Sequence, residues 1–200
     1  MNFLDLPSPL WILSTDTDVG KTHVAARLAR AWSKAGPVTY RKPFQSGVTS
    51  ADDPASDGFV VAGPGIAIEA WVNLRAPLSP QAAAEAEGLS LDLGAAKAWV
   101  RRPHQGRLLL EGVGGLMVPL DGRTHFLAWA TDLDIPAVLV ARGGLGTLNH
   151  VLLSAEALML RGWRIPAILL NPGLDYSHAA AEENAELLRR YLPLPVEILP

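Results

Sequence analysis

A lysine and a threonine stand where an apolar run gives way to a helical pattern, and this pair could bind the phosphates of a nucleotide. The loop reads Ser14-Thr15-Asp16-Thr17-Asp18-Val19-Gly20-Lys21-Thr22 and follows the apolar run at 10–13. Gly20 lets the backbone approach a phosphate, and the amides after it would point at that phosphate from a helix N-terminus. Lys21 would neutralise phosphate charge and the Thr22 hydroxyl would bind Mg²⁺. The alternative is a Gly-Lys-Thr that only begins a helix, because the usual pattern G-x-x-x-x-G-K-[ST] has glycine where this chain has Thr15.

An acidic residue that could complete a metal site follows another apolar run. Glu111 comes directly after Leu108-Leu109-Leu110 and directly before Gly112-Val113-Gly114-Gly115. An acid in that place can reach Mg²⁺ held by Thr22, and the glycines favour a backbone packed close to a ligand. The alternative is an acidic strand end before a glycine turn. Asp57 is a second candidate ligand, with Asp52 and Asp53 as competitors and a solvated loop aspartate as the alternative.

A second lysine begins the segment Lys42-Pro43-Phe44-Gln45-Ser46-Gly47, just after the apolar run at 38–41. By itself, this lysine would be taken for a surface residue before a proline turn. If the run is a strand of a parallel sheet, however, Lys42 lies at its carboxyl end, where open α/β sheets bind ligands. This position makes Lys42 a candidate site residue.

Short apolar runs alternate with longer helical patterns, and these elements must position the polar residues. Strands are predicted at 10–13, 38–41, 108–110, 137–141, 165–170 and 196–199. Helices are predicted at 24–32, 81–87, 93–101, 148–161 and 179–191. Strands that are apolar throughout suit a parallel sheet covered on both faces. The order predicts one α/β domain over residues 1–200, a doubly wound and mostly parallel sheet with helices on both faces, and a long loop at 49–65.

The composition limits the chemistry and the partners of the chain. With 200 residues, 49% hydrophobic and 18% charged, it can bury a sizeable core. The net charge of −3 gives no general attraction to nucleic acid or to anionic membranes. The absence of cysteine excludes disulfides, zinc-thiolate sites and thiol nucleophiles. No signal peptide and no membrane-spanning stretch is evident, so we expect a cytoplasmic protein.

The motifs occur in the order found in dethiobiotin synthetases. The stretch from Thr15 to Thr22 resembles the variant phosphate loop of that family, G-T-D-T-x-V-G-K-T, and Ser14 replaces its first glycine. That replacement matters if the backbone there needs a positive φ. The segment at 42–47 resembles the family's K-P-x-x-S-G, and the segment at 111–115 matches its E-G-x-G-G. Leu145-Gly146-Thr147-Leu148-Asn149-His150 is similar to the family's L-G-x-x-N-H.

These matches run in order from residue 14 to residue 172, and through them the chain resembles ATP-dependent ligases with a P-loop NTPase-like fold. The resemblance implies that 7,8-diaminononanoate is closed with CO₂ to the cyclic urea of dethiobiotin, with release of ADP and phosphate. It implies Lys42 and Lys21 as catalytic residues, Mg²⁺ as cofactor and ATP as co-substrate. Family chains continue beyond the position of Pro200 into a segment that helps to hold adenine, so looser base selectivity is expected here.

The resemblance also assigns binding residues. Those implied to bind ATP are Asp18, Val19, Gly20, Lys21, Thr22, His23, Asp57, Glu111, Gly112, Val113, Gly114, Asn171 and Pro172. Those implied to bind the diamino acid are Thr17, Ser46, Leu148 and Asn149, with the segment around the last two acting across a homodimer interface. Those implied to bind the metal are Thr22, Asp57 and Glu111. For the segment at 145–150 the alternative is an ordinary helix start capped by Thr147.

Three other functions compete with this interpretation. A partition-type P-loop ATPase would act as a switch, but its second lysine, in K-G-G-x-x-K-[ST], has no counterpart among Thr15, Asp16 and Thr17. An amidase-type relative would need a glutaminase domain with a cysteine, and the chain has none. A catalytically degenerate nucleotide-binding dimer stays open because of Ser14. A steady ATPase rate without the diamine would favour the switch.

Overall fold

The computed structural model describes residues 2–50, 52–173 and 178–199. In these residues, seven strands form a single sheet in the order β3-β2-β4-β1-β5-β6-β7, and every pairing is parallel. The strands are β1 (Leu10–Ser14), β2 (Val38–Ser46), β3 (Ile66–Leu74), β4 (Arg107–Glu111), β5 (Ala137–Arg142), β6 (Ile168–Asn171) and β7 (Val196–Ile198). The parallel sheet predicted from the apolar runs is thereby confirmed, and its strand order reverses around β1 as in doubly wound folds.

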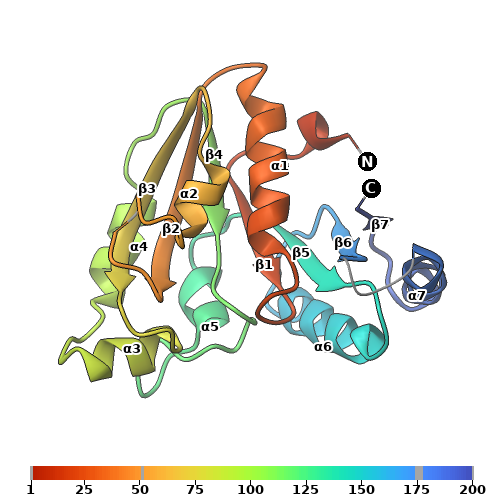
Figure 1. The fold of residues 1–200 in the computed structure, drawn as a ribbon. Helices are drawn as coiled ribbons and strands as arrows, with labels where there is room; N and C mark the ends of the chain where they lie inside the picture. The colour runs from red at the N-terminus through yellow and green to blue at the C-terminus, as the bar shows by residue number, and fades with distance from the viewer. Residues whose placement is uncertain (1, 51, 174–177, 200) are drawn as a thin grey trace.

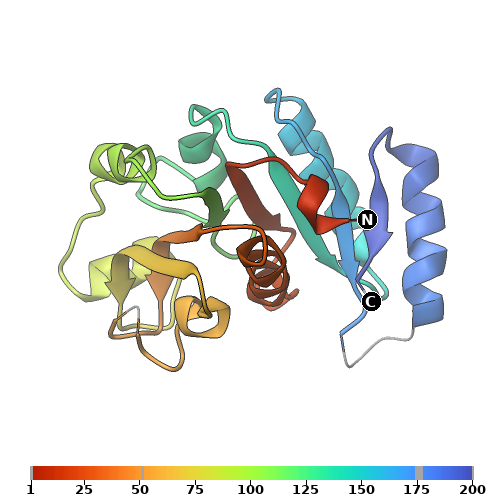
Figure 2. The same ribbon diagram turned by 90° about the horizontal axis from the view of Figure 1, so that it is seen from above.

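Helices cover both faces of the sheet (Figures 1 and 2). One face carries α1 (Lys21–Ser33) and α2 (Asp57–Val61), and the other carries α4 (Leu93–Val100), α5 (Phe126–Thr131) and α6 (Thr147–Met159). The helix α7 (His178–Tyr191) packs beside β7, while α3 (Pro80–Ala86) lies near the end of β2 and β3. A 3₁₀ turn, η1 (Phe3–Asp5), precedes β1. Among the described residues, no helix combines the length and the apolar character that crossing a bilayer requires.

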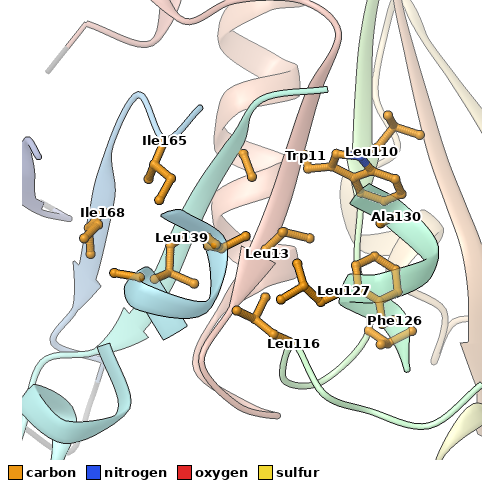
Figure 3. Close-up of a cluster of buried hydrophobic side chains, with 14 of the residues drawn as sticks. Trp11, Leu13, Leu110, Leu116, Phe126, Leu127, Ala130, Leu139, Ile165 and Ile168 are labelled. Atoms are coloured by element: carbon orange, nitrogen blue, oxygen red, sulfur yellow. The ribbon is translucent and has the colours of Figure 1, made fainter. Parts of the chain in front are cut away.

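The core divides into two layers because successive strand residues point to opposite faces. In β1, Leu10 and Ile12 pack toward α1, whereas Trp11 and Leu13 pack toward α5 and α6. Figure 3 shows the second layer, in which Trp11 meets the ring of Phe126 edge to face at 5.5 Å between centroids. In this arrangement the positive edge of one aromatic ring meets the negative face of the other, which is favourable. The aromatic rings thus fix the packing of α5 against the centre of the sheet.

The structure corrects several sequence-based boundaries. β2 continues through Pro43 to Ser46, so Lys42 lies inside the strand and not after it. Beyond Arg41 this strand pairs with β3 alone, so its side toward β4 forms no ladder there. A proline, which has no N–H to donate, is tolerated next to such an unpaired side. The predicted loop at 49–65 contains the helix α2, whose first turn is capped by the Ser56 side chain.

β3 and α5 carried no prediction. β3 is an edge strand with half-buried side chains, and α5 has six residues, too few to show a helical period. The imidazole of His125 caps α5 by accepting a hydrogen bond from the amide of Ala128 at 3.1 Å. The suggested cap of α6 is also different, because Gly146 is the capping residue and Thr147 is the first helical residue.

Candidate active site

A cavity of about 800 Å³ opens where the phosphate loop, β2 and the loop after β4 meet. This is the carboxyl edge of the sheet near the point where the strand order reverses, the usual place for a ligand in such folds. Residues of the predicted site that line it are Thr17, Asp18, Gly20, Lys21, Thr22, Lys42, Ser46, Asp57, Glu111, Val113 and Gly114. Segments far apart in the sequence therefore converge on one space.

The phosphate loop joins β1 directly to α1, as a nucleotide-binding loop requires. Gly20 is the N-cap residue of α1 and has a φ of 98°, which only glycine adopts without strain. No side chain caps this helix N-terminus, so its first amides are available to a phosphate. Asn171 at the end of β6 supports the loop from outside, donating a hydrogen bond from Nδ2 to the carbonyl oxygen of Val19 at 3.1 Å.

Ser14, which replaces a glycine of the family loop, lies in β1 without a positive φ. Its buried hydroxyl lies 2.8 Å from the carbonyl oxygen of Asp16 and 2.7 Å from that of Gly114, so its single proton lies between two acceptors. Lys21 Nζ lies farther from the same two oxygens, at 3.5 Å each. The serine thus ties the phosphate loop to the loop after β4, and its backbone shows no need for glycine.

We expect Ser14→Gly to lower the free energy of unfolding by about 1–2 kcal/mol. The variant loses a buried hydroxyl donor, and glycine adds conformational entropy to the unfolded chain. Urea unfolding monitored by tryptophan fluorescence measures the change. An unchanged or increased stability would contradict the role of the hydroxyl as a tie between the two loops.

A closed group of polar side chains forms the floor of the cavity. The Thr22 hydroxyl lies 2.7 Å from Oδ1 of Asp57 and 2.9 Å from Oε1 of Glu111. Lys42 Nζ lies 2.7 Å from Oδ2 of Asp57 and 2.8 Å from Oε1 of Glu111, and it also donates to the carbonyl oxygen of Gly112 at 2.8 Å. The Glu111 side chain is fully buried, and these contacts satisfy its oxygens there.

The charges in this group shift each other's pKa. Burial alone would lower the pKa of Lys42, but the charges of Glu111 and Asp57 outweigh burial and raise that pKa above its ordinary value. Burial would raise the pKa of Asp57, but the charge of Lys42 and its hydrogen bonds outweigh burial and hold that pKa below its usual value. Lys42 therefore stays a cation and Asp57 stays an anion at neutral pH.

For Lys21, in contrast to Lys42, burial outweighs the neighbouring carboxylates in setting the pKa. Burial, followed by the positive charge of Lys42, lowers the pKa of Lys21 from 10.5 to about 8. An anion placed beside this ammonium would favour its charged form and raise the pKa again. A phosphate bound beside Lys21 would therefore keep this lysine charged to a higher pH than in the free protein.

This pKa predicts a pH dependence of nucleotide binding. Below about pH 8 Lys21 is charged with or without nucleotide, so the Kd for ADP should be flat. Above about pH 8 binding must take up a proton, so the Kd should rise up to about tenfold per pH unit. Isothermal titration calorimetry with ADP from pH 7 to 9.5, in buffers of different ionisation enthalpy, measures both the Kd and the proton uptake. A Kd that stays constant over this range, or a slope that persists in Lys21→Ala, would contradict the assignment.

The donor set suits a hard cation such as Mg²⁺ that is shared with phosphates. Thr22, Asp57 and Glu111 offer a hydroxyl and two carboxylates, and Mg²⁺ commonly takes one or two carboxylates together with substrate oxygens. Among the described residues no group of three or more His, Cys, Asp and Glu side chains could hold a metal without such help. Of the competing aspartates, Asp53 instead accepts hydrogen bonds from Thr49 and Ala55, and Asp52 is exposed.

The remaining predicted residues are placed in different ways. Ser46 Oγ is buried and makes no hydrogen bond, so a polar ligand in the cavity could satisfy it. Val19, Gly112 and Pro172 are buried and do not line this cavity, and His23 is exposed on α1. Leu148 and Asn149 lie in the first turn of α6 and do not line this cavity.

The sequence analysis gave no role to Tyr40 or Gln45, which both support the site. Tyr40 donates a hydrogen bond to Oε2 of Glu111 at 2.9 Å, and burial with the nearby carboxylates raises the pKa of its phenol well above the ordinary value. Gln45 accepts a hydrogen bond from the amide of Asp57 at 3.2 Å and so holds the start of α2. For Tyr40 the signal was its position two residues before Lys42, which in a strand places both side chains on one face.

Comparisons with known proteins agree with this geometry. A family described as "AAA domain" matches residues 9–197. The ATP-dependent dethiobiotin synthetase BioD of Anaeromyxobacter dehalogenans is 38% identical, over 96% of this chain and 89% of that protein. The enzyme of the same name from Paramagnetospirillum magneticum is also 38% identical, over 93% of this chain and 88% of that protein.

Solved structures support the fold. The septum site-determining protein MinD of Pyrococcus horikoshii, in complex with Mg-ADP, matches with a TM-score of 0.56 and 15% identity, over 96% of this chain and 80% of that one. At that identity the likeness concerns the fold alone. The identity to the two synthetases extends over nearly the whole of both sequences, and on that ground the chain belongs to the ATP-dependent dethiobiotin synthetase family.

Proposed function

We propose that the cavity at the carboxyl edge of the sheet is where this chain carboxylates and closes 7,8-diaminononanoate to dethiobiotin at the expense of ATP. The observation that carries the proposal is the convergence of Lys21, Thr22, Lys42, Asp57 and Glu111 on one space. These are the residues to which the family resemblance assigns the chemistry. The relatives named as ATP-dependent dethiobiotin synthetases support the same reaction.

The proposed reaction needs positioning and charge, and no covalent enzyme intermediate. CO₂ adds to one amine of the substrate and gives a carbamate with loss of a proton. A carbamate oxygen attacks the γ-phosphorus of ATP, and the bond to ADP breaks. The second amine attacks the carbonyl carbon of the resulting mixed anhydride, expels phosphate and loses a proton, which closes the urea ring. Each step is favoured when the reacting groups are held together among fixed cations.

The residues have separate tasks in this scheme. The amides after Gly20 and the ammonium of Lys21 bind the phosphates, while Lys42 faces the transferring phosphoryl group and the carbamate. Mg²⁺, which Thr22, Asp57 and Glu111 would hold, supplies charge neutralisation for the phosphate oxygens. Binding at this place would require Lys42 to exchange carboxylate contacts for contacts with the substrate.

The diamino acid would lie along Thr17 and Ser46, with its carboxylate toward the first turn of α6 in a second copy of the chain. A homodimer is supported by exposed apolar side chains before, on and directly after α6, namely Leu145 at 95%, Leu153 at 59% and Leu160 at 77% exposure. A second cavity of about 680 Å³ lies beside Leu153 and Leu160 and also touches Thr17. A partner that covers this surface would bring Leu148 and Asn149 of one copy toward the site of the other. The proposed compartment is the cytoplasm, where ATP is supplied.

Phosphate release with product detection tests the function. The protein is incubated with Mg·ATP and bicarbonate, with and without 7,8-diaminononanoate, and dethiobiotin is followed by mass spectrometry. We expect phosphate release that depends on the diamine and matches the dethiobiotin formed. Release that ignores the diamine would instead support an ATPase switch, and nucleotide binding without release would support a degenerate binding protein. Sedimentation velocity of the same preparation tests the dimer.

A further inference from the structure

The two oxygens of the Glu111 carboxylate have different surroundings. Oε1 accepts a hydrogen bond from the Lys42 ammonium at 2.8 Å and lies 2.9 Å from the Thr22 hydroxyl oxygen, which has a single proton to donate and also lies 2.7 Å from Oδ1 of Asp57. Oε2 accepts the Tyr40 hydroxyl at 2.9 Å in a fully buried contact. Both oxygens of the carboxylate are therefore held by hydrogen bonds, Oε1 on the side of Thr22 and Lys42 and Oε2 on the side of Tyr40.

The backbone explains why Tyr40 reaches this carboxylate. β2 and β4 are neighbouring parallel strands in which Tyr40 pairs with Leu109, two residues before Glu111. Side chains two residues apart share a face, so Tyr40 and Lys42 of β2 both lie on the same side of the sheet as Leu109 and Glu111. The tyrosine is fully buried among residues that pack on α1. Burying a phenol hydroxyl is unfavourable without a partner, and Glu111 is the partner it has.

We propose that Tyr40 is a positioning residue for the metal site, because its hydroxyl holds Oε2 of Glu111 and so keeps Oε1 turned toward Thr22 and the cavity. The last torsion of a glutamate side chain is soft, and a carboxylate without a fixed donor on one oxygen can rotate. Outer donors of this kind typically change metal affinity by about 10–100-fold when they are removed. The inference rests on the proposed function, in which Glu111 binds Mg²⁺.

Tyr40→Phe tests the inference because it removes the hydroxyl and keeps the ring. Mn²⁺ binding in the presence of ADP is measured by the electron paramagnetic resonance signal of free Mn²⁺, and ADP binding in EDTA is measured separately. We expect the Kd for Mn²⁺ to rise about tenfold or more, while the Kd for ADP in EDTA stays within about twofold. Tyr191→Phe is the matched control, because it makes the same change at a tyrosine that is 72% exposed on α7 and should leave both constants unchanged.

The outcomes separate the inference from the proposed function. If the wild-type chain with ADP binds no Mn²⁺, the proposed metal site itself fails. If it binds Mn²⁺ and Tyr40→Phe binds it equally well, Tyr40 has no positioning role. An equal loss of ADP affinity with and without metal would show a general packing defect and would also overturn the inference.

A second measurement covers the case in which Tyr40→Phe does not fold. The chain with Tyr176→Phe and Tyr191→Phe is labelled with 3-fluorotyrosine, so that its one ¹⁹F signal is that of Tyr40. Replacing EDTA with Mg²⁺ in the presence of ADP should shift this signal, because the carboxylate that accepts its hydrogen bond gains a cation. A buried signal that does not move would overturn the inference.

Discussion

Replacing Lys42 with alanine should reduce the rate of diamine-dependent phosphate release by about 100-fold or more. Lys42 is a buried cation that lines the cavity and has a pKa above its ordinary value, so its charge is fixed before any substrate arrives. A charge fixed in advance stabilises a developing negative charge without reorganisation during the reaction. Single-turnover rates with saturating Mg·ATP and diamine measure the loss.

The same substitution should also lower stability. Removing Lys42 leaves Asp57 and Glu111 close together without their shared cation, and breaking a buried ion pair in this way typically costs about 3–5 kcal/mol. Asp57 is partly exposed, so we expect a value at the lower end, about 3 kcal/mol. Mg²⁺ with ADP should restore part of this loss, because a ligand that binds only the folded state stabilises it. Thermal unfolding with and without Mg·ADP measures both effects.

A catalytic loss must be separated from an unfolding loss. The rates are therefore compared at a temperature at which circular dichroism shows each variant folded. Lys34→Ala, at the exposed end of α1, removes the same charge far from the carboxylates and should change neither rate nor stability by much. If folded Lys42→Ala keeps more than about a tenth of the wild-type rate, Lys42 does not carry the proposed charge stabilisation.

The parts of the fold that could be predicted are those with a local signal. The apolar runs at 10–13 and 137–141 form central strands because a strand buried on both faces must be apolar at every position. The phosphate loop was predictable as well, since Gly20, Lys21 and Thr22 are adjacent in sequence. Glu111 followed from its place directly after an apolar strand.

The parts that escaped prediction depend on partners distant in sequence. Whether Asp53 or Asp57 faces Thr22 is decided by where α2 begins, and Gln45 on β2 holds that start in place. Tyr40 looked like an ordinary core residue, because only the register of β2 against β4 places its hydroxyl on Glu111. Likewise, Ser14 replaces the first glycine of the family's phosphate loop. The consequence of that replacement depends on the carbonyl groups of Asp16 and Gly114, which its hydroxyl contacts only in the folded chain.

Gly20→Ala should weaken ADP binding by about 100-fold or more. The residue has a φ of 98°, in the region where a side chain costs about 1–2 kcal/mol. An added Cβ would also collide with the Asn171 side chain, which donates to Val19 and supports the loop. Relief of either strain would turn the loop amides away from the phosphate, and losing two charged hydrogen bonds corresponds to a 100-fold change. Calorimetric titration with Mg·ADP measures the affinity.

Two further variants identify which strain matters. Gly88→Ala also adds a Cβ at positive φ, 68°, but meets nothing within 4 Å, so it should lose about 1 kcal/mol of stability and no ADP affinity. If the collision dominates at Gly20, then Asn171→Ala added to Gly20→Ala should recover part of the affinity, relative to the effect of Asn171→Ala alone. Simple additivity of the two losses would instead assign the effect to the backbone φ. Full ADP affinity in Gly20→Ala would mean that the loop does not bind phosphate in the way its sequence and position indicate.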